Sequence, residues 1–231
     1  RIRNCPSDGG KVPGTIGIPR SPFKKGADMK AVIVVARLLS ALSRPMYYSL
    51  VGFVILFTVT YMQIFPWQYK LWVLCSTYIF TIGLPVLGIY LYKRFSGLTA
   101  YQLRHRKTRF WPYVISLSCY ATYLKIMHAM HLPRFMCGIV LGALFIQGVC
   151  LLLNLRWKVS MHAAGAGGII GALAAYSGIF SFNPVWWLCG AFILDGMVMT
   201  SRMILRQHSL LQVWTGTIVG IIFGYLGIVL A

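Results

Sequence analysis

Two short polar motifs stand out in a chain that consists largely of apolar segments. Each motif places a histidine near a basic residue: Lys158-x-Ser160-x-His162 and Ser201-Arg202-x5-His208. A histidine can attack phosphorus or transfer protons, and nearby cations can neutralise charge that develops on phosphate oxygens. These residue types therefore predict phosphoryl transfer through a phosphohistidine. In an apolar, membrane-like chain they favour a lipid phosphatase.

The shortage of acidic residues limits the other kinds of chemistry. The sequence has 22 Lys and Arg residues against three acids, Asp8, Asp28 and Asp195, and contains no Glu. Hydrolysis by divalent metal ions needs clustered carboxylates, which such a chain cannot supply. The six cysteines include no C-x-x-C pair, so neither a zinc site nor a disulfide framework is indicated. We expect no metal and no other cofactor.

The composition predicts an integral membrane protein. Of the 231 residues, 58% are hydrophobic and only 11% are charged. A helix needs roughly 20 apolar residues to cross a bilayer, and backbone inside lipid must be helical. The chain offers seven expected spans, at 47–65, 71–92, 112–130, 134–153, 160–181, 184–200 and 208–231. We therefore predict an all-α, polytopic bundle of six to seven transmembrane helices in one domain.

The first residues differ from the rest. Residues 1–28 are rich in Pro, Gly, Lys and Arg and lack the apolar centre of a signal peptide. We interpret them as a disordered basic tail or as sequence upstream of a start at Met29, with the membrane domain covering 29–231. The segment 31–42 is expected to lie along the membrane interface before a break at Pro45.

Basic residues gather in three loops that should face the same side of the membrane. These loops, at 93–111, 154–159 and 201–207, are separated by two spans each, and two crossings return a chain to the side it left. They carry ten Lys or Arg residues, against Lys70 and Arg134 in the opposite loops. Cations confined to such loops do not indicate nucleic-acid binding. They predict an anion-binding mouth, although the positive-inside rule and lipid headgroups also account for loop cations.

Small residues follow both histidines. A glycine-rich run occupies 163–168, and Gly216-x3-Gly220-x3-Gly224 occupies the last span. Such faces let helices approach closely and would bring His162 near His208, although generic helix packing is an equally good explanation of the glycines alone.

The motifs resemble those of the type 2 phosphatidic acid phosphatase (PAP2) superfamily of integral-membrane lipid phosphatases. The third family motif, Ser-Arg-x5-His-x3-Asp, is matched by Ser201, Arg202 and His208. The second, Pro-Ser-Gly-His, is matched at Ser160 and His162, with Val and Met in place of Pro and Gly.

The remaining motif is altered. The family's Lys-x6-Arg-Pro appears here as Arg106-x2-Arg109-x2-Pro112. The similarity covers roughly residues 93–231, and the variant motifs are similar to a bacterial branch of PAP2-like proteins.

The resemblance implies a mechanism that needs no metal. His208 would attack phosphorus, and His162 would protonate the leaving lipid oxygen and then activate water. The phosphate oxygens would be bound by Arg202, Arg109, Arg106, Lys158 and Ser160.

The family aspartate four residues after the nucleophile is Gln212 here. A glutamine carbonyl can orient the imidazole, but it brings no negative charge. Asp195, the only acid within a span, could compensate for it or could pair with Arg202. A slow enzyme or a silent PAP2-like lipid-binding or transport protein is therefore the alternative.

The expected substrate is a lipid phosphate or diphosphate of polyprenyl, phosphatidyl or lipid A type, with membrane lipids as the other partners. The sequence ranks neither these lipids nor the oligomeric states. The resemblance implies the bacterial inner membrane with the site at the periplasmic face, whereas the loop charges favour the cytoplasmic side.

Overall fold

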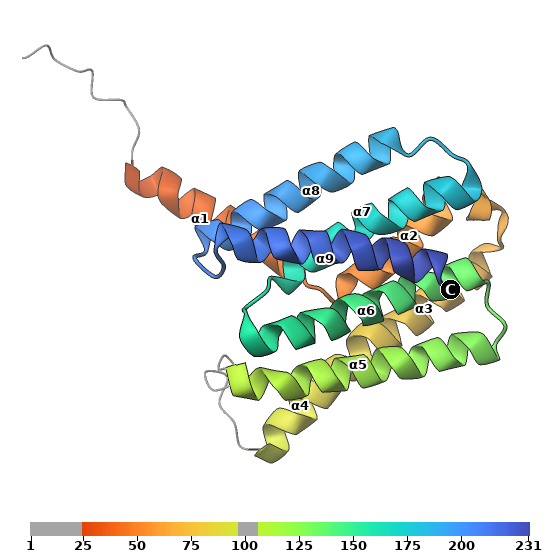
Figure 1. Cartoon of the computed structure of the whole chain (residues 1–231), viewed down its shortest axis with the longest axis horizontal. Coiled ribbons are helices and arrows are strands. Elements are labelled where there is room, and N and C mark those ends of the chain that lie inside the picture. Colours follow the sequence, from red (N-terminus) through yellow and green to blue (C-terminus); the bar gives the residue numbers. More distant parts are fainter. Residues whose placement is uncertain (1–24, 97–105) are drawn as a thin grey trace, which may run out of the picture.

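The structure is a computed structural model that describes residues 25–96 and 106–231. Within these ranges every regular element is a helix and there is no strand, which confirms the all-α prediction (Figure 1). The α-helices are α1 Lys25–Leu42, α2 Tyr47–Val59, α3 Trp67–Tyr78, α4 Leu84–Ser96, α5 Arg106–Ala129, α6 Arg134–Arg156, α7 Met161–Phe180, α8 Val185–Ile204 and α9 Leu210–Val229. A 3₁₀-helix, η1 (Tyr61–Ile64), precedes α3, and a π-helix, η2 (Ile79–Gly83), joins α3 to α4.

In the described part of the chain, five helical segments are long and apolar enough to cross a membrane. They are Trp67–Phe95, Arg134–Arg156, Met161–Phe180, Val185–Ile204 and Leu210–Val229. A sixth arises if α1 and α2, which are bent by 74° at the break around Pro45, form one span. The chain thus belongs to the class of helical membrane proteins with five to six candidate spans.

Two of the seven expected spans differ from the structure. The span at 47–65 is too long, because α2 ends at Val59 and η1 follows it. The segment 112–130 lies in α5, a helix of 24 residues that is not among the five apolar segments. Its sequence explains this result, since hydroxyl-bearing residues and Lys125 interrupt its apolar positions.

The N-terminal boundary also differs in part. The helix α1 begins at Lys25, so it runs through the expected boundary at residue 28, and it contacts α8. Residues 1–24, on which most of the expected tail falls, lie outside the described residues.

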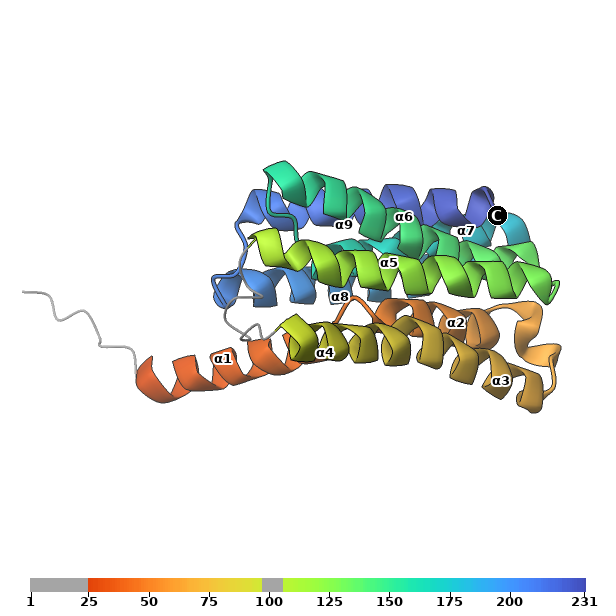
Figure 2. The same ribbon diagram turned by 90° about the horizontal axis from the view of Figure 1, so that it is seen from below.

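The two motif loops lie at the same end of the bundle. Figures 1 and 2 show the α6–α7 and α8–α9 connections together at this end, and the α5–α6 and α7–α8 connections at the other. Both motif loops therefore lie at one end of the bundle, as a common side of the membrane would require. Of the third basic loop, residues 97–105 lie outside the described residues, and its ends belong to α4 and α5, which end and begin at the motif end.

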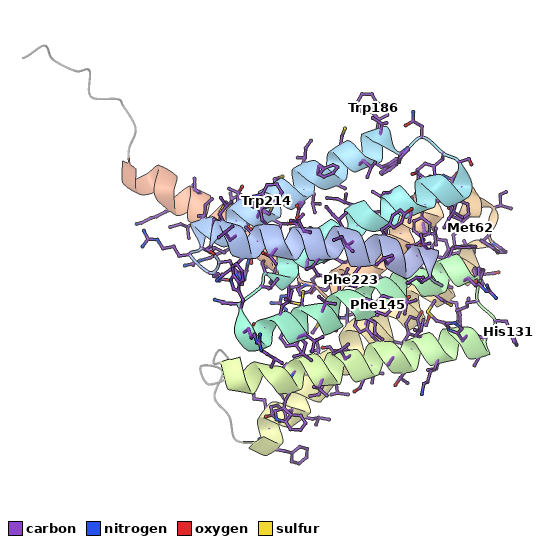
Figure 3. All side chains as sticks on the ribbon, viewed as in Figure 1. Met62, His131, Phe145, Trp186, Trp214 and Phe223 are labelled. Atoms are coloured by element: carbon purple, nitrogen blue, oxygen red, sulfur yellow. The ribbon has the colours of Figure 1, made fainter. Side chains whose placement is uncertain are left out.

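The opposite end carries the tight turn after α5. Figure 3 shows His131 there, far from the motif loops. His131 has a φ of 53°, and the amides of His131 and Leu132 bond the carbonyls of His128 and Met127 at 3.0 and 3.1 Å. This is the hydrogen-bond pattern of a Schellman motif, which ends a helix on a left-handed residue.

The centre of the bundle is the contact between α7 and α9, the most extensive helix–helix contact among the described residues. A Cβ added at Gly216 would lie 2.5 Å from the Ser160 carbonyl oxygen, and one added at Gly224 would lie 2.5 Å from the Gly168 carbonyl oxygen. Backbone therefore meets backbone along this seam, as the small residues predicted. Phe145 of α6 packs against the seam on Phe223 of α9, with ring centroids 6.4 Å apart (Figure 3).

Candidate active site

His208 lies in the short connection between α8 and α9, beside the N-terminus of α9. Its Nδ1 is 3.3 Å from Oε1 of Gln212, and the same oxygen accepts a hydrogen bond from the backbone N–H of Ser209 at 3.2 Å. The glutamine therefore has two tasks: it caps the first turn of α9 and it orients the imidazole. With Nδ1 held in this way, Nε2 is the ring nitrogen directed away from Gln212.

The loop that carries His208 is shaped by the end of α8. Arg206 has a φ of 51°, and the amides of Arg206 and Gln207 bond the carbonyls of Met203 and Arg202 at 2.9 and 3.1 Å. This second Schellman motif stops α8 directly before the histidine. Lys158 Nζ donates to the Gln207 carbonyl oxygen at 2.8 Å and ties the α6–α7 connection to the same loop.

His162 lies in the first turn of α7, which begins after Ser160. The Ser160 hydroxyl accepts a hydrogen bond from the amide of Ala163 at 3.4 Å, and the Ser160 amide donates to the Gln212 carbonyl oxygen at 3.2 Å. Ser160 is completely buried. It therefore fixes the start of α7 against α9, and its contact with phosphate stays a prediction.

Arg202 lies in the last turn of α8 and is only 8% exposed. Its Nη1 donates a hydrogen bond to Oγ of Ser40 at 2.5 Å. The His162 ring also bonds the backbone of Ser40. The end of α1 thus holds both a cation and a histidine of the candidate site.

His162, Arg202 and His208 line one pocket with a volume of about 310 Å³. Its other walls come from the bend between α1 and α2, from α4, from the start of α5 and from α6. The wall residues are Pro45, Met46, Ile89, Pro112, Tyr113, Ser116, Gln147, Val159 and Met161. The structure therefore brings the histidines of the second and third motifs and the arginine of the third motif to one cavity, at the motif end of the bundle.

The other predicted phosphate ligands are placed less favourably or are not described. Lys158 is engaged with the α8–α9 loop and is not part of the pocket wall. The side chains of Arg106 and Arg109 lie outside the described residues, although both positions belong to the first turn of α5.

Asp195 was expected either beside His208 or paired with Arg202, and the structure places it against Thr217 of α9. Both of its carboxylate oxygens accept from the Thr217 hydroxyl, at 3.2 and 3.1 Å, and the residue is buried between α8 and α9. The structure thus ties Asp195 to α9, and its expected roles at His208 and Arg202 stay predictions. Gln212 is the residue that orients His208.

Two residues of the site were missed in the sequence. Ser40 precedes Arg202 by 162 residues, so no local pattern connects them. Arg44, in the bend after α1, lies near enough for its charge to act on His162. The only signal was that these polar residues interrupt an apolar stretch directly before Pro45.

Among the described residues, no three His, Cys, Asp or Glu side chains lie close enough together to hold a metal ion. Comparisons of the chain with protein-family models, with curated proteins and with solved structures found no match.

Proposed function

We propose that this protein is a metal-independent membrane lipid phosphatase of the PAP2 type, which hydrolyses a lipid phosphate or diphosphate. The proposal depends on one observation above all: His162, Arg202 and His208 line the same pocket, although they come from three separate elements. Two histidines provide a nucleophile and a proton donor, and a buried arginine provides charge for phosphate oxygens.

In the first step, Nε2 of His208 bonds to phosphorus while the bond from phosphorus to the lipid oxygen breaks. His162 gives its proton to the departing oxygen, so the lipid leaves as an alcohol, or as a monophosphate if the substrate is a diphosphate. Gln212 accepts the Nδ1 hydrogen bond of His208 and keeps Nε2 directed toward the pocket.

In the second step, His162 takes a proton from water, and the water oxygen attacks phosphorus. The bond from phosphorus to Nε2 breaks, which releases inorganic phosphate and restores His208. Arg202, held by Ser40, binds the phosphate oxygens in both steps and neutralises the charge that develops there.

A lipid fits this site better than a soluble phosphate. The pocket lies at one end of apolar helices, and its wall contains Met46, Ile89 and Met161 beside the polar groups. In this proposal the phosphate stays at the membrane surface while the tail remains among the helices. The proposal places the protein in a bacterial inner membrane with the site at the periplasmic face.

The test is phosphate release by detergent-purified protein in the presence of EDTA, measured on a short-chain lipid phosphate. We expect release by the unchanged protein and by His128→Ala, a histidine exposed at the far end of α5. We expect loss of activity, by about 10³-fold or more, in His208→Ala.

A protein that binds lipid phosphates without hydrolysing them is the second candidate. The neutral Gln212 beside His208 favours it, because an orienting amide does not stabilise the charge of a phosphohistidine. Binding of lipid phosphate without phosphate release, equal in the unchanged protein and His208→Ala, would select this candidate.

A further inference from the structure

A narrow apolar slot leads from the candidate site into the bundle. It runs between α2, α6, α7 and α9 and shares Pro45, Gln147 and Met161 with the pocket of the two histidines. On α7 its wall extends from Met161 to Tyr176, 15 residues along the helix, which is about 22 Å at 1.5 Å per residue. The slot is therefore continuous with the site at one end and reaches deep into the bundle.

The width of the slot is set by two glycines of α7 and by the side chains that pack on them. The Tyr48 ring packs directly on Gly165, and a Cβ added at Gly168 would lie 2.8 Å from Cδ1 of Ile146. The volume within the slot is about 60 Å³. Spread over the length of the slot, this volume leaves room for one hydrocarbon chain and not for two side by side.

The wall chemistry matches a hydrocarbon over most of the slot, and its polar residues are Tyr48, Ser49, Gln147 and Tyr176. Most lining residues are aliphatic or glycine, and Tyr176 satisfies its hydroxyl by donating to the Phe135 carbonyl oxygen at 2.7 Å. Gln147 is 6% exposed, and its Oε1 has no hydrogen-bond partner among the described residues. Buried polar atoms are normally paired, so this oxygen, where slot and pocket meet, points to a bound group.

We propose that the slot holds the hydrocarbon chain of a single-chain lipid phosphate whose phosphate lies against His162, Arg202 and His208. This inference rests on the proposed function and narrows its substrate class. A cationic pocket joined to a one-chain apolar slot is complementary to an anionic amphiphile with one tail. Gln147 Oε1 accepts a hydrogen bond where head and tail join, from a glycerol hydroxyl or from a protonated phosphate oxygen. Isoprenoid and monoacyl glycerol phosphates share this shape, and diacyl phosphatidate does not.

The first measurement compares substrates on the unchanged protein in mixed micelles at fixed mole fraction. The substrates are an isoprenyl phosphate, a monoacyl glycerol phosphate, a diacyl phosphatidate and a four-carbon alkyl phosphate. We expect kcat/KM for at least one long single-chain substrate to exceed that for the diacyl lipid by about tenfold or more, because only a single tail can be buried fully in the slot. Comparison of kcat/KM for the isoprenyl phosphate and the monoacyl glycerol phosphate identifies which of the two single-chain lipids is the better substrate.

The second measurement fills the slot. Ala172 lines it on α7, and Ala174 lies on the same helix outside it. We expect Ala172→Phe to lower the ratio of long-chain to four-carbon kcat/KM by about tenfold, and Ala174→Phe to leave this ratio unchanged. If Ala172→Phe fails to fold, Ala143→Phe fills the slot from α6.

Failure of the inference is distinguishable from failure of the proposed function. Equal kcat/KM for single-chain and diacyl lipids, with the four-carbon phosphate still hydrolysed, would overturn the slot and leave the phosphatase. If nothing is hydrolysed, the proposed function fails, and thermal stabilisation by the same lipids tests the slot. A larger rise in Tm with single-chain than with diacyl phosphates then supports the slot, and equal or absent shifts overturn it.

Discussion

At the residue scale, Gln212 explains how a neutral side chain replaces the expected aspartate. Its carbonyl oxygen is held by the Ser209 amide and by Nδ1 of His208 at once. A glutamine has the length that an N3 residue needs to reach back to the N-cap amide. The orientation of the imidazole is therefore retained and the negative charge is lost.

Restoring that charge should accelerate the reaction. Gln212→Glu keeps an oxygen in the same place and stabilises the positive phosphohistidine, and the N-terminus of α9 favours its carboxylate. In serine proteases, replacing the orienting carboxylate with an amide lowers kcat by about 10⁴; we expect a smaller gain here, about tenfold or more. Steady-state kcat on a short-chain substrate measures it. Gln212→Leu, which orients nothing, should fall below the unchanged protein, and a Glu variant as slow as the Leu variant would contradict this role.

Ser40 should position Arg202 without touching the substrate. Removing the hydroxyl in Ser40→Ala takes away the partner of a charged donor, a change of about 1.5–3 kcal/mol, and Arg202 then binds phosphate less well. We expect kcat/KM to fall by about tenfold or more, with recovery in Ser40→Thr. Ser118→Ala on the exposed face of α5 is the matched control. Equal kinetics for Ser40→Ala and this control would exclude the positioning role.

At the element scale, the seam between α7 and α9 determines whether the two histidines meet. A Cβ at Gly220 would overlap the Ala164 carbonyl oxygen, whereas a Cβ at Gly190 on α8 meets nothing within 4 Å. Separating the helices should therefore disturb both packing and site.

We expect Gly220→Ala to lower Tm in detergent and to reduce phosphate release together. Gly190→Ala should lower neither the Tm nor phosphate release, because the added methyl group finds open space there and alanine has a higher helix propensity than glycine by about 1 kcal/mol. Thermal unfolding and activity of the two variants provide the comparison. A Gly220→Ala protein with unchanged Tm would show that the seam tolerates separation.

The end of α8 provides a second test of an element. Arg206 adopts a left-handed conformation, which costs a residue with a Cβ about 1–2 kcal/mol. Arg206→Gly should therefore have a higher Tm than Arg206→Ala, since both lose the charge and only glycine loses the strain. An equal Tm for the two variants would contradict the Schellman end of this helix.

At the scale of the whole molecule, the sequence predicted what depends on local composition. Helical class, most spans and the common end of the two motif loops follow from apolar length and from the number of crossings. The exceptions have physical reasons: α2 ends early and bends against α1, and α5 is a long helix with polar residues along it.

What the sequence did not predict depends on contacts between distant segments. Ser40 meets Arg202 across 162 residues, and Asp195 bonds Thr217 on α9 where a partner for Arg202 or His208 was expected. The slot is formed by four helices, α2, α6, α7 and α9, and no single segment reveals it.

In the proposed mechanism, His208 carries the phosphoryl group between the two steps. The most direct measurement is mass spectrometry of His162→Ala after incubation with p-nitrophenyl phosphate and an alkaline quench, which preserves phosphohistidine. The p-nitrophenolate leaving group of this substrate needs no proton, so the first step proceeds without His162. Hydrolysis of the phosphohistidine is slowed, because His162 no longer activates water. We predict that phosphate accumulates on His208 and on no other histidine. A phosphorylated residue elsewhere, or phosphate release without any phosphohistidine, would contradict it.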